Sequence, residues 1–230
     1  MCSSFLHRIK SVLVIFGTLL LCFAGGVLGQ DVVDKTVATV TDGLKTELIT
    51  YSDLRWQLAL QPNVTLNPAT SEDLNRAMQL LINQRIFALE AERIPRAAPT
   101  EKEISDKIAE ILSYFPNTAE FERRLNIVGF SSVKDDNFER IIAERVAIDK
   151  YLDFRFRAFI VITAEDENKY YRDTFVPEFT RRYPGVILPT IDEKRPDINR
   201  ILTEERVATN IETFLDEAKR RVEVVTLSKL

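Results

Sequence analysis

The residue types that most often carry enzymatic chemistry are scarce in this sequence. Cysteine occurs only at Cys2 and Cys22, and His7 is the single histidine among 230 residues. All three lie within residues 1–29, which we expect to be removed as an export signal. The mature chain would then have no thiolate nucleophile, no disulfide, no zinc site built from cysteine and histidine, and no Ser-His-Asp triad.

Paired carboxylates are the remaining candidates for acid–base or metal chemistry. Two pairs are adjacent in the sequence, Asp135-Asp136 and Glu204-Glu205, and such pairs can act as general acid and base or bind a hard cation. We expect both pairs at or near helix starts, where acidic side chains interact favourably with the helix dipole. A glycine-rich loop that would bind phosphates is also missing. The sequence therefore predicts no catalytic residue, no metal site and no cofactor.

Aromatic side chains are the stronger candidates for a functional surface. Four of them, Tyr170, Tyr171, Phe175 and Phe179, fall within ten residues. Ordinary packing against a helical bundle would account for such rings, and so would an exposed surface that holds unfolded peptide. The candidate lining of a peptide-binding surface is Phe154, Phe156, Phe159, Tyr170, Tyr171, Phe175 and Phe179.

One long helix is predicted over residues 70–93, and the rest of the chain is expected to pack around it. Its apolar residues recur at spacings of three, four and seven, and Leu80 and Phe87 widen the stripe. Thr70 and Asp73 form a capping pattern at its start, and Pro95 ends it. The predicted buried face consists of Leu74, Ala77, Met78, Leu81, Ile82, Ile86 and Leu89.

The same Thr-x-x-Asp or Thr-x-x-Glu pattern predicts where other helices begin. It starts at Thr50, Thr100, Thr163 and Thr190. Two further helices are predicted over residues 119–128, ended by a left-handed turn at Gly129, and from 132–135 to about 157. The last helix, after Thr190, is expected to bury this apolar stripe: Ile198, Ile201, Leu202, Ala208, Ile211, Leu215, Ala218 and Val222.

Segments with strand character occur only near the two ends of the mature chain. Residues 37–40 and 48–50 flank the turn signal Thr41-Asp42-Gly43, and residues 222–227 alternate in polarity. Because a lone strand is not stable, the terminal strand needs the early hairpin as its partner. The predicted fold is therefore mainly α, a helical bundle with a small β-sheet that joins the N-terminal hairpin and the C-terminal strand.

Residues 1–29 have the features of a signal peptide. A basic start with Arg8 and Lys10 precedes an uncharged apolar run over residues 12–28, and Val27 and Gly29 suit the positions before a cleavage site. The alternative is a retained membrane anchor, although the run falls short of the roughly 20 residues that span a bilayer. We expect a signal peptide over residues 1–29, a folded domain over residues 30–230, and a location in the periplasm or cell envelope.

The charge balance argues against nucleic-acid partners. Loss of Arg8 and Lys10 lowers the 31 basic residues to 29, against 35 acidic ones. With no clustered basic stripe, binding to a phosphate backbone lacks its usual electrostatic source. The expected partners are unfolded or partly folded exported proteins, and contact with a membrane is expected only through the signal segment.

A series of short segments follows an order that is typical of one protein family. In sequence order they are Val37-Ala38-Thr39-Val40, Ile49-Thr50 with Asp53-Leu54, residues 80–85 (LLINQR), residues 90–93 (EAER), residues 99–104 (PTEKEI), residues 161–166 (VITAED) and Tyr170-Tyr171. This order resembles the chaperone core of SurA-type periplasmic chaperones and related parvulin-type foldases. The resemblance implies a peptide-binding domain like those of SurA and trigger factor, with an N-terminal part over residues 30–162 and a C-terminal part over residues 163–230.

The sequence departs from the family where an isomerase domain is usually inserted. The resemblance places that insertion after Tyr171, but only a short loop lies between Phe179 and Thr190, whereas a parvulin domain needs roughly a hundred residues. The histidines of the parvulin centre also have no counterpart. We therefore predict an exported, ATP-independent holdase without prolyl-isomerase activity. The alternatives are an isomerase-family member with residual activity and a dedicated interaction subunit of the cell envelope.

Overall fold

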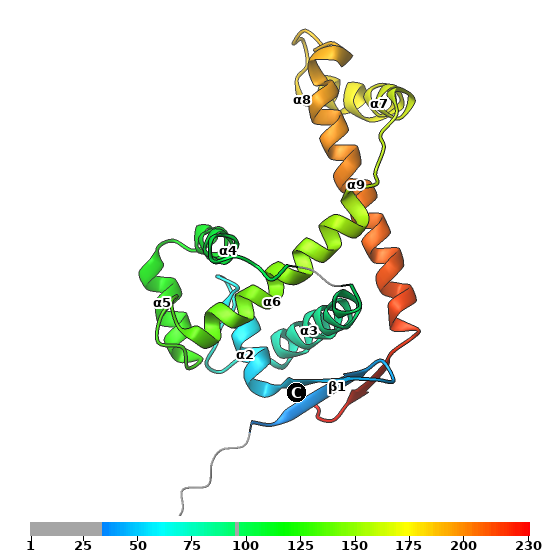
Figure 1. Cartoon of the computed structure of the whole chain (residues 1–230). Helices are drawn as coiled ribbons and strands as arrows, with labels where there is room; N and C mark the ends of the chain where they lie inside the picture. Colours follow the sequence, from blue (N-terminus) through cyan, green and yellow to red (C-terminus); the bar gives the residue numbers. More distant parts are fainter. Residues whose placement is uncertain (1–33, 95–96) are drawn as a thin grey trace, which may run out of the picture. The chain divides into compact units, whose positions relative to one another are not determined.

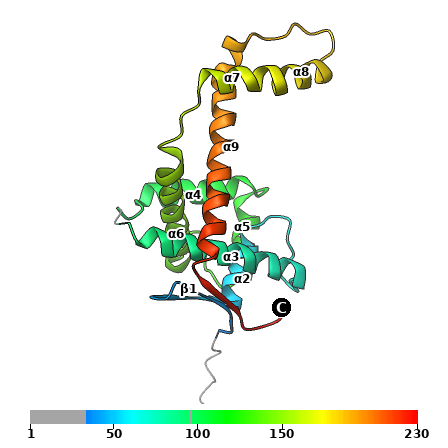
Figure 2. The ribbon, with the colours of Figure 1, turned by 90° about the vertical axis from the view of Figure 1, so that its right-hand side faces the viewer.

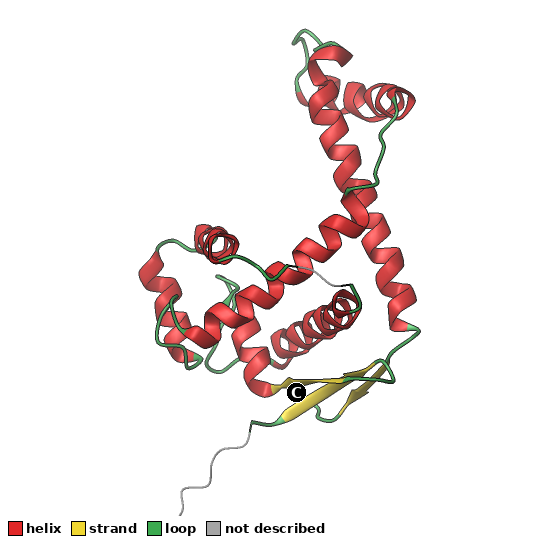
Figure 3. Ribbon diagram, in the orientation of Figure 1, coloured by secondary structure: helices red, strands yellow, loops and turns green. Residues whose placement is uncertain are grey.

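The computed structural model describes residues 34–94 and 97–230 (Figure 1). The predicted signal peptide, together with Cys2, Cys22 and His7, lies outside the described residues. The described part of the chain is mainly α-helical and contains one three-stranded antiparallel sheet (Figure 3). The predicted fold class is confirmed.

The sheet joins the two ends of the folded chain, as predicted. Strand β1 (Thr36–Thr41) lies in the centre, between β2 (Thr46–Thr50) and β3 (Glu223–Thr226). Val40 is paired with Val224 across the β1–β3 ladder, and Leu227 N–H donates to the Val37 carbonyl over 2.8 Å. The C-terminal strand is therefore held by backbone hydrogen bonds to the first strand.

Helices make up the rest of the described chain. They are α2 (Tyr51–Ala59), α3 (Ser71–Glu92), α4 (Glu101–Ser113), α5 (Thr118–Ile127), α6 (Asp136–Leu152), α7 (Ala164–Tyr170), α8 (Val176–Arg182) and α9 (Ile191–Lys219). Two π-helical turns, η1 (Asp153–Arg157) and η2 (Tyr171–Phe175), follow α6 and α7. Both turns fall within segments that the sequence predicts as plain helix.

Threonine caps start the helices where the sequence predicts them. Thr50, Thr100, Thr163 and Thr190 each accept the amide hydrogen three residues later, and the acidic residue there accepts the threonine amide in return. At the start of α3, the side chain of Thr70 likewise accepts the amide hydrogen of Asp73. Each such cap contributes about 1 kcal/mol. These helix starts are therefore set by local hydrogen bonds.

Helix α3 supplies the centre of the core. All seven residues of its predicted buried face are buried, and so is Phe87. Leu80, which the sequence places on the widened stripe, is 41% exposed instead. It lies on the same face as Arg76, one turn earlier, and that face is exposed. The apolar stripe is therefore wider on the Phe87 side only.

A second buried cluster connects α9 to this core. Phe214 of α9 packs with Phe87 of α3 and Tyr151 of α6. The predicted stripe of α9 is partly wrong, because Ala208 is exposed, whereas Val207 and Phe214, which the prediction omits, are buried. Along its length α9 contacts α7, then η1, then α3. Because the neighbours of α9 change along its length, different faces of the helix are buried at different positions.

A buried arginine closes the end of α2. Arg124 of α5 donates to the carbonyls of Leu58, Ala59 and Gln61 over 2.9, 3.1 and 2.7 Å. Burial lowers the pKa of the guanidinium, which has no carboxylate partner among the described residues. The side chain therefore satisfies backbone acceptors that α2 leaves open at its C-terminus.

Helix α7 packs against α9 rather than against the sheet, and α8 continues from it through η2. Figures 1 and 2 both place α7 beside the first part of α9, with the sheet at the other end of α9, and Figure 2 shows α8 extending away from α9. We call residues 164–190 the arm; it comprises α7, η2, α8 and the loop before α9. The arm contacts α9 through α7.

Candidate peptide-binding surface

The two carboxylate pairs occupy different positions in their helices. Asp135 is the N-cap of α6, as expected for that pair. The expectation for Glu204-Glu205 is wrong, because α9 starts at the cap of Thr190 and runs through this pair without a break. Glu204 accepts two hydrogen bonds from Arg157, over 2.6 and 2.7 Å, which lower the pKa of its carboxyl. Glu204 thus ties η1 to α9.

Two further observations bear on possible sites. The described part of the chain does not bring three or more histidine, cysteine, aspartate or glutamate side chains together in a way that would hold a metal ion. No helix within residues 34–94 and 97–230 has both the length and the apolar character needed to span a bilayer.

Four aromatic rings follow one another along the arm at intervals of four residues. Tyr171 stacks on Phe175 with ring centres 5.5 Å apart, Phe175 lies 5.5 Å from Phe179, and Phe179 lies 5.1 Å from Tyr183. None of the four rings is fully buried. We call them the aromatic row. Offset and tilted contacts of this kind stabilise the rings mutually while leaving one side of each available.

The π-helical turn η2 lies under the start of this row. Val176 N–H donates to the carbonyl of Tyr171, five residues earlier, so the helix is locally wider than an α-helix. Such turns occur often at functional sites. The Tyr171 hydroxyl donates to the Pro189 carbonyl over 2.7 Å, which ties the loop back to the helix.

Tyr170 has a different environment from its neighbour Tyr171. It is half-buried, and burial together with the nearby Glu205 and Glu178 raises the pKa of its hydroxyl. Its ring takes no part in the row. Of the four clustered candidates, the structure therefore groups three.

The other three candidates lie outside the arm. Phe154 and Phe159 contact each other edge to face, 6.3 Å apart, and Phe159 is 75% exposed. The ring of Phe156 lies 5.3 Å from that of Phe214 and packs, partly buried, against the second buried cluster. Phe154 also lines an open hollow of about 750 Å³ formed by the end of α6, η1 and α9, and Val207 and Ile211 of α9 belong to the same lining. The candidates therefore form an exposed pair, Phe154 and Phe159, and a partly exposed row of three in the arm, whereas Phe156 and Tyr170 belong to neither group.

The most exposed apolar residues of the arm are ones that the sequence reasoning missed. Ile187 is 90% exposed, and Tyr183, Val186 and Leu188 beside it are exposed as well. A signal for them exists in the sequence, because an apolar run between Pro184-Gly185 and Pro189 is part of neither a helix nor a paired strand. These side chains extend the aromatic row into the loop.

A buried carboxylate anchors the arm on α9. Glu167 of α7 accepts hydrogen bonds from Arg195, over 2.5 Å, and from Asn199, over 2.8 Å. The bonds from Asn199 and Arg195 lower the pKa of this carboxyl. Glu167 is the only buried side chain within residues 164–190, all of which are described. The arm is therefore held by polar contacts and leaves its apolar side chains accessible.

Comparison with known proteins adds no family at this point. No protein-family model matches the sequence, and no curated protein is found to be similar to it.

Proposed function

We propose that this protein is an exported, ATP-independent holdase that binds unfolded segments of envelope or secreted proteins through the arm. One observation carries the proposal. The arm presents the aromatic row and the apolar loop around Ile187 at its surface, while its only buried side chain is the carboxylate of Glu167. Exposed apolar side chains that gather in one segment are typical of sites that bind other chains.

The kind of contact suits a client without fixed structure. Aromatic rings offer a large apolar area and lose little side-chain entropy on binding, so they adapt to many sequences. The row is a surface rather than a closed pocket, and it positions no nucleophile or general base. Weak and adaptable contacts of this kind suit transient binding of an unfolded client better than catalysis.

The sequence supports the proposal from a second direction. Residues 30–230 contain neither cysteine nor histidine, and the order of their motifs resembles the chaperone core of SurA-type proteins without the parvulin domain. The proposed location outside the cytoplasm is based on the signal-like pattern of residues 1–29, which lie outside the described residues.

The proposal is tested by suppression of client aggregation without ATP. An unfolded outer-membrane protein is diluted from denaturant in the presence of the purified protein, and light scattering is followed. Prolyl isomerisation of a proline peptide is measured on the same sample, with the uncatalysed rate expected. We expect the double variant Phe175→Ala, Phe179→Ala to lose most of the protection.

A matched control removes exposed apolar side chains elsewhere. Leu48 and Leu80 lie on the sheet and on α3, and both are exposed. The double variant Leu48→Ala, Leu80→Ala is expected to protect clients as well as the unaltered protein does. Protection of one client only would identify a dedicated interaction subunit instead, and accelerated isomerisation would identify an isomerase.

A further inference from the structure

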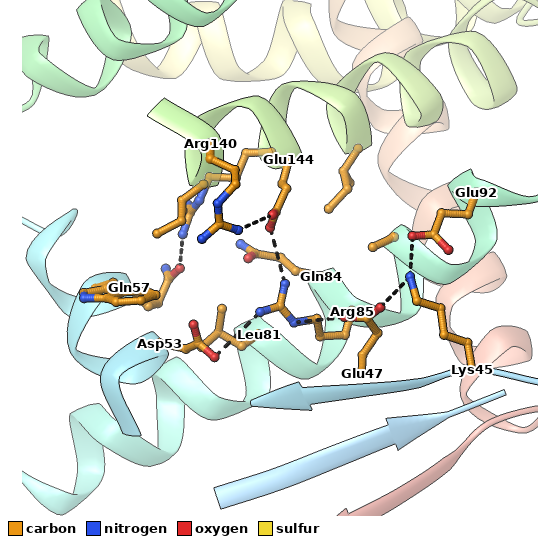
Figure 4. Close-up of a pocket in the computed structure, with 15 residues that line it drawn as sticks. Lys45, Glu47, Asp53, Gln57, Leu81, Gln84, Arg85, Glu92, Arg140 and Glu144 are labelled. Carbon is orange, nitrogen blue, oxygen red and sulfur yellow. Dashed lines mark hydrogen bonds and ion pairs between the residues drawn. The ribbon is translucent and has the colours of Figure 1, made fainter. Parts of the chain in front are cut away.

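A second hollow, far from the arm in sequence, lies between the sheet and helices α2, α3 and α6. It encloses about 360 Å³, within the range of about 300–1,000 Å³ that is usual for small-ligand pockets. Its apolar wall includes Trp56, Leu81, Ile141 and Ile148. The remaining lining is dominated by charged side chains, shown in Figure 4.

The charges of the pocket balance in number. The cations are Lys45, Arg85, Arg140 and Arg145, and the anions are Glu47, Asp53, Glu92 and Glu144. A ligand with a large net charge is therefore disfavoured. The charges are not paired one to one, however. One end of the pocket is richer in carboxylates, and the other end is richer in guanidinium groups.

One end of the pocket carries an excess of carboxylate. Lys45 Nζ lies 2.8 Å from Glu47 and 2.7 Å from Glu92, so a single cation serves two anions. In Figure 4 these residues lie on one side of Arg85, and Gln57 lies on the other. The side chain of Glu92 is more than half exposed, so this end is open to solvent.

The other end carries an arginine without a carboxylate partner. Arg145 donates to the side-chain amide oxygen of Gln57, and among the described residues it forms no ion pair. Its Nε atom is buried and has no hydrogen-bond acceptor. Burial is the main cause that lowers the pKa of Arg145 to about 10; the charge of Asp149 opposes this shift, and that of Arg85 adds to it. A buried guanidinium in this state gains free energy from any carboxylate that reaches it.

Arg85, between the two ends, is only loosely paired. Its guanidinium lies 3.6 Å from Glu144, 3.7 Å from Asp53 and 4.0 Å from Glu47, and its Nε atom also lacks a hydrogen-bond acceptor. These separations exceed the 2.7–2.9 Å of a charge-assisted hydrogen bond. Asp53 is already held by the Thr50 amide, and Glu144 by Arg140. Two guanidinium groups therefore retain unused donor atoms within one pocket.

We propose that this pocket binds a small zwitterion, with a free α-amino acid as the simplest form. The ligand carboxylate lies against Arg145 and Arg85, and its ammonium group lies toward Glu47 and Glu92. A short apolar side chain contacts Leu81, Ile141 and Ile148. Such a ligand leaves the net charge of the pocket unchanged and gives both arginines the acceptor that the protein does not supply.

Trp56 provides a reporter for this test, because it is the only tryptophan of the chain and lines the pocket. The full-length protein is titrated with leucine, alanine and phenylalanine, and tryptophan fluorescence and binding heat are recorded. At least one of them is expected to bind with saturation. Leucinamide lacks the carboxylate and N-acetyl-leucine lacks the ammonium group, so each is expected to bind about tenfold or more weakly than leucine.

Two variants and a control separate the site from general effects on folding. Arg145→Gln is expected to weaken binding about tenfold or more. Ala88→Leu fills the pocket without changing its charges and is expected to abolish binding, which covers the case in which Arg145→Gln fails to fold. Arg76→Gln removes an exposed arginine of α3 that is paired with Glu72, and is expected to change nothing.

Three results would overturn the proposal. The first is the lack of saturable binding by all three amino acids. The second is equal binding of N-acetyl-leucine and leucine, which would indicate a site for the carboxylate of a chain end. The third is unchanged binding in Ala88→Leu, which would place the ligand elsewhere.

Discussion

Helix α3 and the arm use their side chains in opposite ways. Eight residues of α3 are buried, and all eight are apolar. The arm, over residues 164–190, buries one side chain only, the carboxylate of Glu167. In α3 the apolar residues hold the fold together, whereas the arm is anchored on α9 through Glu167 and the Asp166–Arg206 ion pair, and its aromatic rings stay at least partly exposed. The contrast teaches that aromatic content alone does not identify a core.

The largest expected effect concerns aromatic rings in these two regions. Phe121 is fully buried, with Phe115 and Phe138 at 4.7 and 5.9 Å. We expect Phe121→Ala to lower the free energy of unfolding by about 3–5 kcal/mol. Phe175→Ala, in the aromatic row, should lower it by about 1 kcal/mol or less, because the ring is only partly buried. Urea unfolding measures both, and equal losses would remove the distinction between core and arm.

A smaller effect is expected from the buried arginine of the core. Arg124→Met removes a donor from three carbonyls at the end of α2, of which that of Leu58 still accepts from the Gln61 amide, at a cost of about 2–3 kcal/mol. The neighbouring Arg123 is exposed and paired with Glu120. Arg123→Met should change the stability by about 0.5 kcal/mol at most. If the two variants unfold at the same urea concentration, the carbonyl contacts of Arg124 do not stabilise the protein.

The smallest effect on the whole protein is expected from the anchor of the arm. Because the pKa of Glu167 is lowered in the folded state, its stabilising effect is present above the ordinary value of 4.5 and is lost as the pH falls through the lowered value. Amide protection in α7 should therefore decrease as the pH falls below 4.5, while protection in α3 is maintained. The measurement is hydrogen exchange, expressed as protection relative to the unfolded chain.

Glu167→Gln provides the control for this pH effect. In this variant the α7 amides should exchange severalfold faster at neutral pH. Their protection should no longer change with pH below 4.5, since glutamine does not titrate. A variant that keeps the full pH dependence would show that another group, such as Asp166 at the cap of α7, controls the arm.

Local patterns predicted much of the fold. The threonine caps, the buried face of α3 and the pairing of residues 37–40 with the C-terminal strand all follow from residue types at short spacing. The mid-helix position of Glu204-Glu205 does not follow from such spacing, because adjacent acidic residues occur both inside helices and at helix starts. The burial of Val207 instead of Ala208 depends on which neighbours α9 contacts, and periodicity does not contain that information.

The arrangement of the candidate residues could be predicted only in part. The spacing of Phe175 and Phe179 by four residues already places them on one helical face. Phe156 differs from the other candidates because it packs against Phe214, which lies more than fifty residues later in the sequence. The π-helical turn η2 has no evident sequence signal. The charged pocket depends on contacts among α2, α3, α6 and the sheet, so its unpaired Arg145 could be recognised only in three dimensions.

The most direct test of the account compares two equally exposed apolar residues in the two regions. Ile187 of the arm is 90% exposed, and Leu44 in the turn between β1 and β2 is 95% exposed. A photo-crosslinking amino acid is placed at each position in turn, and an unfolded outer-membrane protein is added without ATP. The account predicts crosslinks from position 187 and few from position 44. Equal crosslinking from both positions, or none from position 187, would contradict it.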